Sequence, residues 1–115
     1  MKEARYSGGM PARVSVALCT RNSARFVEPQ IRSILDQTVP PAEIVLSDDS
    51  STDDTVEKVI ALVAASPTDV VLTVLRNAEP LGVTANFQRA VMACTMPLIA
   101  LSDHDDIWMP GRIEA

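Results

Sequence analysis

The chain has 115 residues, of which 47% are hydrophobic and 3% aromatic, and its 15 acidic and 10 basic residues give a formal net charge of −5. This length fits one compact domain, and the apolar content is too high for a disordered or low-complexity chain. The negative charge argues against binding to nucleic acid through charge, and no apolar run reaches the roughly 18 residues that a membrane span needs.

Residues 1–12 are expected to form a flexible leader, and residues 13–115 one folded unit. The leader lacks the apolar segment of a secretory signal peptide. Cys19 and Cys94 lie in apolar segments, which predicts two free thiols and favours a reducing cytoplasm. No Cys/His spacing typical of a zinc site is present in the sequence.

The predicted elements begin with a strand at residues 14–19, which form a short β-branched run. The polar residues 20–23 follow as a turn and helix cap. Apolar residues at spacings of three to five predict a helix over about residues 28–37, with Pro29 in its first turn. The proline pair 40–41 is expected to end this first unit.

The second strand is predicted at residues 43–47 and the second helix at about 55–65. Asp54 is expected to cap this helix, with Glu57 as its partner in a capping box. Gly82 is expected to form the turn before the third helix. The third strand, the third helix and the fourth strand are predicted at residues 70–75, about 84–94 and 98–101.

This alternation predicts an α/β fold of three layers, with a mainly parallel sheet (β-α-β-α-β-α-β) covered by helices on both faces. Right-handed crossovers place the ligand sites of such Rossmann-like sheets at the carboxyl ends of the strands, near a topological switch point. The functional residues are therefore expected in the segments that directly follow the strands.

Seven of the nine aspartates lie in two short clusters, and without them eight acidic residues would face ten basic ones. The net negative charge therefore belongs to two local sites on a body that is slightly basic. One cluster follows the second predicted strand and the other follows the fourth; they are Asp48, Asp49, Asp53 and Asp54, and Asp103, Asp105 and Asp106.

The two clusters favour different chemistry. Asp53 and Asp54 suit helix capping. Asp48 and Asp49 lie too early for that, and they need hydrogen-bond donors such as the ribose hydroxyls or base N–H of a nucleotide. The Asp-x-Asp of the second cluster holds hard oxygen ligands that suit Mg²⁺ or Mn²⁺ bridging to a diphosphate, with a solvated acidic loop as the alternative. An EF-hand is excluded because Trp108 stands where that loop needs glycine.

Four segments resemble motifs of family 2 glycosyltransferases, in the family's order. Residues 14–22 (VSVALCTRN) resemble the family's opening strand and turn, and residues 33–38 (SILDQT) resemble its "SILxQT" helix end. Residues 43–55 (EIVLSDDSSTDDT) are similar to "EIIVVDDGSTDDT", and residues 101–108 (LSDHDDIW) to the "DxDD" segment. The resemblance covers about residues 14–113, and four co-linear motifs together are highly specific.

The resemblance implies a GT-A fold, a nucleotide-sugar donor, a divalent metal (Mn²⁺ or Mg²⁺) and transfer with inversion at the sugar carbon. Residues 13–115 would be the nucleotide-sugar-binding part of this fold. Asp49 would bind the base or ribose, with Asp48 beside it. Asp103 and Asp105 would hold the metal. The other residues that the resemblance places at the nucleotide are Thr20, Arg21, Asn22, Gly82, Asn86, Asp103 and His104.

The sequence departs from the family pattern at two positions. Arg21 stands where many relatives have tyrosine, which bears on stacking against the base, and Thr84 stands where many have arginine. The donor is expected to be UDP- or dTDP-linked, and the similarity of the segment SDHDDIW to bacterial rhamnosyltransferases favours dTDP.

Family members usually continue further, and the general base that deprotonates the acceptor is expected beyond Ala115. The chain is therefore interpreted as the donor-binding part of a bacterial enzyme of cell-wall or polysaccharide biosynthesis, inactive or nearly so by itself. The acceptor would be a saccharide or a lipid-linked molecule. The enzyme would be cytoplasmic or peripheral at the inner membrane face. Self-association through an exposed sheet edge or apolar surface is also expected.

Four other classes remain to be weighed against this pattern. A receiver-type signalling domain would need a phospho-acceptor Asp where Asn77 stands and a lysine after the last strand, yet the only lysines are Lys2 and Lys58. A nucleotidyltransferase would need a glycine-rich, basic phosphate loop in place of residues 20–23. A non-catalytic nucleotide-binding module stays open, as does an interaction module, which predicts no metal-dependent nucleotide binding.

Overall fold

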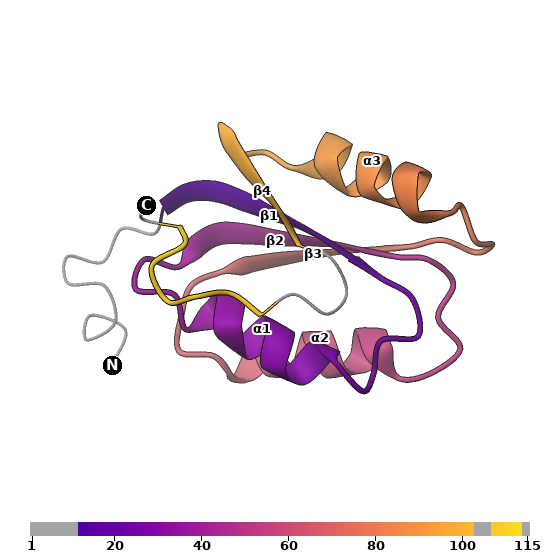
Figure 1. Cartoon of the computed structure of the whole chain (residues 1–115), viewed down its shortest axis with the longest axis horizontal. Helices are drawn as coiled ribbons and strands as arrows, with labels where there is room; N and C mark the ends of the chain where they lie inside the picture. The colour runs from indigo at the N-terminus through magenta and orange to yellow at the C-terminus, as the bar shows by residue number, and fades with distance from the viewer. Residues whose placement is uncertain (1–11, 103–106, 114–115) are drawn as a thin grey trace.

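The computed structural model describes residues 12–102 and 107–113. They form a parallel four-stranded sheet in the order β3-β2-β1-β4, with α1 and α2 on one face and α3 on the other (Figure 1). The predicted three-layer α/β architecture is therefore confirmed. The elements in chain order are β1 Ala12–Thr20, α1 Val27–Leu35, β2 Pro41–Asp48, α2 Thr55–Ala65, β3 Val71–Arg76, α3 Val83–Ala93 and β4 Leu98–Ser102.

Two predicted boundaries shift for local reasons. Helix α1 begins at Val27 because the carbonyl of Ser23 accepts the N–H groups of Phe26 (2.8 Å) and Val27 (2.9 Å), so that a separate turn precedes the helix. Pro41 does not end the preceding unit but opens β2 opposite Ala12. Proline is tolerated at the first residue of a strand, where its missing N–H costs no ladder bond.

The start of α2 at Thr55 is confirmed, but the predicted capping box is wrong. Asp54 occupies the N-cap position and makes no side-chain capping bond. Asp53 accepts the Thr55 N–H instead (3.1 Å), together with the Thr55 hydroxyl. Glu57 cannot complete the box because its carboxylate pairs with Arg76 at 2.8 Å.

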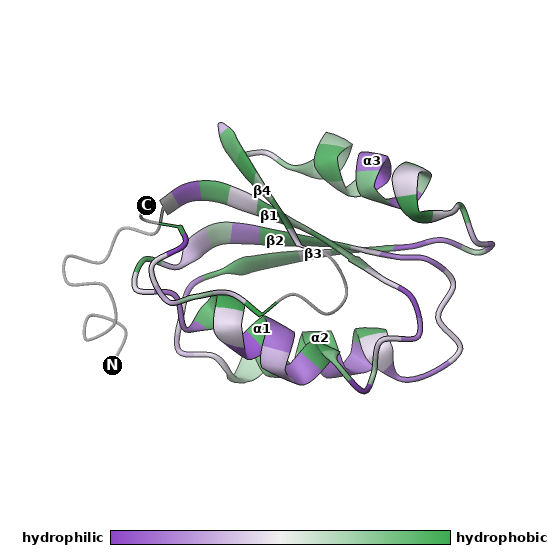
Figure 2. Ribbon diagram, viewed as in Figure 1, coloured by the Kyte–Doolittle hydropathy of each residue, from purple (hydrophilic) through white to green (hydrophobic). Residues whose placement is uncertain are grey.

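The hydrophobic core lies on both faces of the two central strands, because successive side chains of a strand point to opposite faces. Val16 and Leu18 of β1 face α1 and α2, whereas Ala17 and Cys19 face α3. Figure 2 shows the strands mostly in hydrophobic colours. Each fully buried Val, Leu or Ile side chain stabilises the fold by about 1.5–3 kcal/mol. The α1/α2 face holds most of this core, including Ile31, Ile34, Ile44, Leu46, Val56, Val59 and Trp108.

The edge strand β4 is less covered than the central strand β2. Leu98 is 65% exposed and Leu101 51% exposed, whereas every side chain of β2 except Ala42 is buried. Both cysteines are free thiols, as predicted, with Cys19 buried and Cys94 half-buried. Within the described part of the chain, the helices are all too short or too polar to span a membrane.

The strand register brings the carboxyl ends of the strands to one edge. Thr20 pairs with Asp48, and Asp48 pairs with Arg76. On the other side of β1, Leu18 pairs with Ser102, the last residue of β4. The loops after β1, β2 and β3 therefore meet at this edge, close to the start of α3.

Candidate nucleotide site

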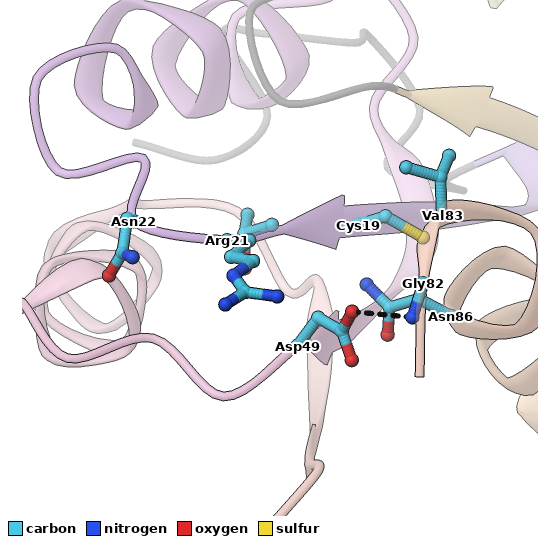
Figure 3. Close-up of a pocket in the computed structure, with 8 residues that line it drawn as sticks. Cys19, Arg21, Asn22, Asp49, Gly82, Val83 and Asn86 are labelled. Atoms are coloured by element: carbon cyan, nitrogen blue, oxygen red, sulfur yellow. Dashed lines mark hydrogen bonds between the residues drawn. The ribbon is translucent and has the colours of Figure 1, made fainter. Parts of the chain in front are cut away.

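A cavity of about 380 Å³ opens at the carboxyl edge of the sheet (Figure 3). Its walls come from the end of β1, the first residue after β2 and the start of α3. Six of the residues predicted at a nucleotide site lie in these walls, and Cys19 and Val83 join them. The lining is Cys19, Thr20, Arg21, Asn22, Asp49, Gly82, Val83 and Asn86.

Asp49 lies at the centre of the hydrogen bonding around this cavity, although only 4% of the residue is exposed. Its Oδ1 accepts the Asn77 Nδ2 amide at 2.9 Å and the Leu81 N–H at 2.7 Å, and its Oδ2 accepts the Gly82 N–H at 3.0 Å. Burial alone would raise the pKa of Asp49, but these hydrogen bonds and the charge of Arg21 outweigh it and lower the pKa. The carboxylate is therefore ionised at neutral pH and acts as an acceptor.

The hydrogen bonds to Asp49 hold the beginning of α3 against the end of β2. Gly82 is the N-cap of α3, with φ +91°, and its carbonyl accepts the Asn86 N–H at 2.9 Å. A Cβ at this position would meet no atom within 4 Å, so the conformation and not the space favours glycine here. The positive end of the helix dipole adds to the stabilisation of the Asp49 carboxylate.

Asn86 joins α3 to β2 through the side chain and main chain of Ser47. Its Oδ1 accepts the Ser47 hydroxyl at 2.5 Å and its Nδ2 donates to the Ser47 carbonyl at 3.0 Å. The residue is 3% exposed, so these bonds replace contacts with water. Asn86 lines the cavity, and its polar atoms fix the position of α3.

The structure does not bring Asp48 into the cavity with Asp49. Adjacent residues at a strand end point to opposite faces, and the Asp48 Oδ1 accepts hydroxyls from Thr20 and Ser51, both at 2.6 Å. Its Oδ2 accepts the Ser51 N–H at 3.0 Å. Asp48 therefore joins the end of β1 to the loop after β2, and its placement is that of a structural carboxylate.

Asn22 and Arg21 form the wall contributed by the loop after β1. Asn22 has φ +48°, and its Oδ1 accepts the Thr52 N–H at 2.8 Å, while its own N–H donates to the Ser51 hydroxyl at 2.8 Å. These bonds join two loops that are far apart in sequence. Arg21 is exposed, and Figure 3 shows its guanidinium on the same side of the cavity as the Asp49 carboxylate.

The second aspartate cluster cannot be placed in the same way. Asp103, His104, Asp105 and Asp106 lie outside the described residues. Residues 1–11 of the expected leader do so too, whereas Ala12, predicted as its last residue, already belongs to β1. The chain enters this segment from Ser102, which is fully buried beside β1 at the carboxyl edge and accepts the Gln30 amide at 2.9 Å. Among residues 12–102 and 107–113, no group of three or more His, Cys, Asp or Glu side chains could hold a metal ion.

A parallel α/β sheet with a cavity at its carboxyl edge is the arrangement in which open α/β folds bind nucleotides and other ligands. The family is shown by comparison: the chain belongs to "Glycosyl transferase family 2", whose model matches residues 15–115. The resemblance in the four sequence motifs is therefore confirmed, and the fold is that of the GT-A glycosyltransferases.

The relatives include two bacterial sugar transferases. The chain is 29% identical, over 88% of its length and 38% of the relative's, to the UDP-Glc:alpha-D-GlcNAc-diphosphoundecaprenol beta-1,3-glucosyltransferase WfgD of Escherichia coli. It is also 29% identical, over 84% of its length and 34% of the relative's, to the dTDP-rhamnosyl transferase RfbG of Shigella flexneri. The chain thus spans about a third of the length of these relatives.

One similar solved structure is the mannosyltransferase PcManGT from Pyrobaculum calidifontis in complex with GDP-Man and Mn²⁺. It matches with a TM-score of 0.76 and 28% identity, over 86% of this chain and 29% of the mannosyltransferase. These matches agree with the predicted membership of the glycosyltransferase family.

Proposed function

We propose that this chain forms the donor-binding part of a glycosyltransferase and that the cavity at the carboxyl edge binds the nucleoside of a nucleotide-diphosphate sugar. The placement of Asp49 carries the proposal: an ionised carboxylate lines the cavity and is held by three hydrogen bonds from the protein. Base N–H and ribose O–H groups are the donors that such a carboxylate accepts. Thr20, Arg21 and Asn22 would line the nucleoside on the β1 side.

We favour a UDP- or dTDP-linked donor. The similarity to a glucosyltransferase that uses UDP-Glc and to a dTDP-rhamnosyl transferase supports this choice. Arg21, which faces Asp49, offers a flat cation for stacking on a base. His104 would contact the donor sugar or diphosphate.

Asp103 and Asp105 would hold Mn²⁺ or Mg²⁺, because paired carboxylates supply the hard oxygen ligands that these ions prefer. The similar mannosyltransferase contains Mn²⁺ with GDP-Man. The chain leads into these aspartates from the buried end of β4, at the same edge as Asp49. A divalent cation there would neutralise the leaving diphosphate.

The transfer would invert the sugar carbon, and this needs a base that takes the proton from the acceptor. We place that base outside these 115 residues, so this chain alone would bind the donor without transferring the sugar. The acceptor would be a saccharide or a lipid-linked saccharide, in keeping with the similarity to a transferase whose name gives a diphosphoundecaprenol acceptor. The enzyme would act in the cytoplasm, at the inner face of the membrane.

Titration calorimetry with UDP, dTDP and GDP, each with and without Mn²⁺, tests the proposal. We expect UDP or dTDP to bind in the presence of Mn²⁺, and Asp105→Ala to abolish the dependence on the metal. Asp69→Ala, which removes an aspartate outside both clusters, is the matched control and should bind like the wild type. An absence of binding to all three nucleotides would contradict the proposal.

A further inference from the structure

Asn77 follows β3 directly and is the side chain that connects the site residues with one another. It is 5% exposed, and its main-chain N–H donates to the Asp48 carbonyl at 2.9 Å. Its side-chain Nδ2 donates both to Asp49 Oδ1 and to Asn86 Oδ1, each at 2.9 Å. Its side-chain Oδ1 accepts Nη1 of Arg89. Every polar group of its side chain therefore has a partner.

Two charged neighbours fix the orientation of this amide. Arg89 offers only donors, so it selects the carbonyl oxygen of Asn77. The ionised Asp49 offers only acceptors, so it selects the amide nitrogen. A rotated amide would direct its oxygen at a carboxylate and its nitrogen at a guanidinium, which both neighbours disfavour. The hydrogen bond from the Asn77 amide to the Asp49 carboxylate is consequently in place before any ligand binds.

The acceptor positions of Asp49 can then be counted. Each carboxylate oxygen has two lone pairs. Asn77 and Leu81 use both positions of Oδ1, and among the described residues only the Gly82 N–H bonds to Oδ2. One position, on Oδ2, is left for a ligand.

We propose that Asn77 is a positioning residue for donor binding, which restricts Asp49 to a single hydrogen bond with the base and thereby selects bases that present one N–H. The inference rests on the proposed function, since it assigns a role at the same cavity. Uracil and thymine present one N–H between two carbonyl oxygens. Guanine presents two adjacent N–H donors, which call for both carboxylate oxygens and would compete with Asn77 for Oδ1.

The test compares UDP and GDP, in the presence of Mn²⁺, on the wild type and on Asn77→Ala. We expect the wild type to prefer UDP by about tenfold, as one charge-assisted hydrogen bond predicts. Asn77→Ala frees Oδ1, so UDP should bind more weakly while GDP does not, and the preference should fall to about threefold or less. If Asn77 had a purely structural role, Asn77→Ala would weaken the binding of UDP and GDP equally and leave the ratio of the two affinities unchanged.

Two further variants keep the inference testable. Arg89→Gln removes an exposed cation that orients Asn77, and it leaves the core unchanged. The preference for UDP over GDP should therefore fall in this variant as well, even if Asn77→Ala does not fold. Ser15→Ala removes a buried hydroxyl at the opposite edge of the sheet and should leave the ratio unchanged. A wild type that binds GDP as well as UDP, or an unchanged ratio in Asn77→Ala and Arg89→Gln, would overturn the inference. A wild type that binds none of UDP, dTDP and GDP would overturn the proposed function itself.

Discussion

The two ends of β2 carry buried carboxylates that look alike by burial and by pKa. Glu43 at the amino end is 6% exposed and Asp49 just past the carboxyl end is 4% exposed. Each accepts three hydrogen bonds from the protein, and each has a lowered pKa, because these bonds outweigh the effect of burial. Only Asp49 lines the cavity. Burial and a lowered pKa therefore do not by themselves distinguish a binding carboxylate from a structural one.

The partners of Glu43 explain the difference. Its Oε1 accepts the Ser15 hydroxyl at 2.5 Å, the Thr95 N–H at 2.5 Å and the Thr95 hydroxyl at 2.9 Å. Ser15 in turn accepts the Met96 N–H at 3.0 Å. These contacts join β1 and β2 to the connection between α3 and β4, so Glu43 closes the amino edge of the sheet.

The largest expected effect is on ligand binding at the carboxyl end of β2. Asp49→Asn replaces one acceptor oxygen with an amide that donates. In place of Oδ2 this amide would face the N–H groups of Gly82 and the ligand, and in place of Oδ1 it would face the donors of Asn77 and Leu81. We expect UDP affinity, measured by calorimetry with Mn²⁺, to fall on the order of 30- to 100-fold. Glu43→Gln is the control at the other end of the strand. An equal loss of UDP affinity in this variant would contradict the assignment of Asp49 as a binding carboxylate and Glu43 as a structural one.

The second effect is on stability at the amino end. Glu43→Ala leaves the Ser15 hydroxyl and the Thr95 N–H without their acceptor, so the free energy of unfolding should fall by about 2 kcal/mol. Urea unfolding followed by circular dichroism measures this change. The nucleotide affinity of the folded variant should equal that of the wild type. A clear loss of UDP affinity in this variant would mean that the two ends are coupled.

A smaller effect is expected from the middle of the strand. Ile44→Val removes one methylene from a side chain that is fully buried against α1 and α2. The free energy of unfolding should fall by about 1 kcal/mol, again with unchanged affinity for UDP. Urea unfolding measures the change in stability, and calorimetry on the same sample measures the affinity for UDP. A changed affinity would show that a change of packing in the core alters the cavity.

The smallest effect concerns acid. The pKa of Glu43 is lowered in the folded chain, so its stabilising contribution is present above the unfolded-state pKa and is lost as the pH falls through the folded-state pKa. Asp49 and Asp53 act in the same direction. Stability should therefore decline as the pH falls below about 4.5, the ordinary pKa of a glutamate. Urea unfolding as a function of pH should show a shallower decline for Glu43→Gln, and parallel curves would contradict this assignment.

The sequence predicted the elements well and the strand environments less well. The ends of α2 agree with the prediction, because Pro67 and the polar run before Thr55 interrupt the helical pattern sharply. The exposure of β4 was not predicted: its apolar residues indicate a buried strand, and they do not reveal that β4 lies at a sheet edge beyond α3. Strand order depends on contacts between distant segments, which periodicity does not encode.

The candidate site shows the same limit. Asp49 could be predicted because an aspartate after a buried strand is conspicuous. Asn77 was not predicted as a site residue, although its place directly after β3 was a usable signal. Cys19 could have been found by alternation along β1, since it shares a face with Ala17. The structural role of Asp48 could not, because it depends on which face of the sheet each of two adjacent carboxylates enters.

The backbone of Gly82 has a consequence for synthesis of this protein. Its φ of +91° and ψ of 163° are unfavourable for an L-residue, but they are the mirror image of extended backbone that a D-residue adopts readily. An L-Cβ at this position would meet no atom within 4 Å, so L-alanine would be strained here by its backbone conformation alone, and that conformation is one that D-alanine, introduced by chemical ligation, adopts readily. The D-residue would also restrict the conformations of the unfolded chain. The free energy of unfolding of the loop that holds Asp49 would therefore rise.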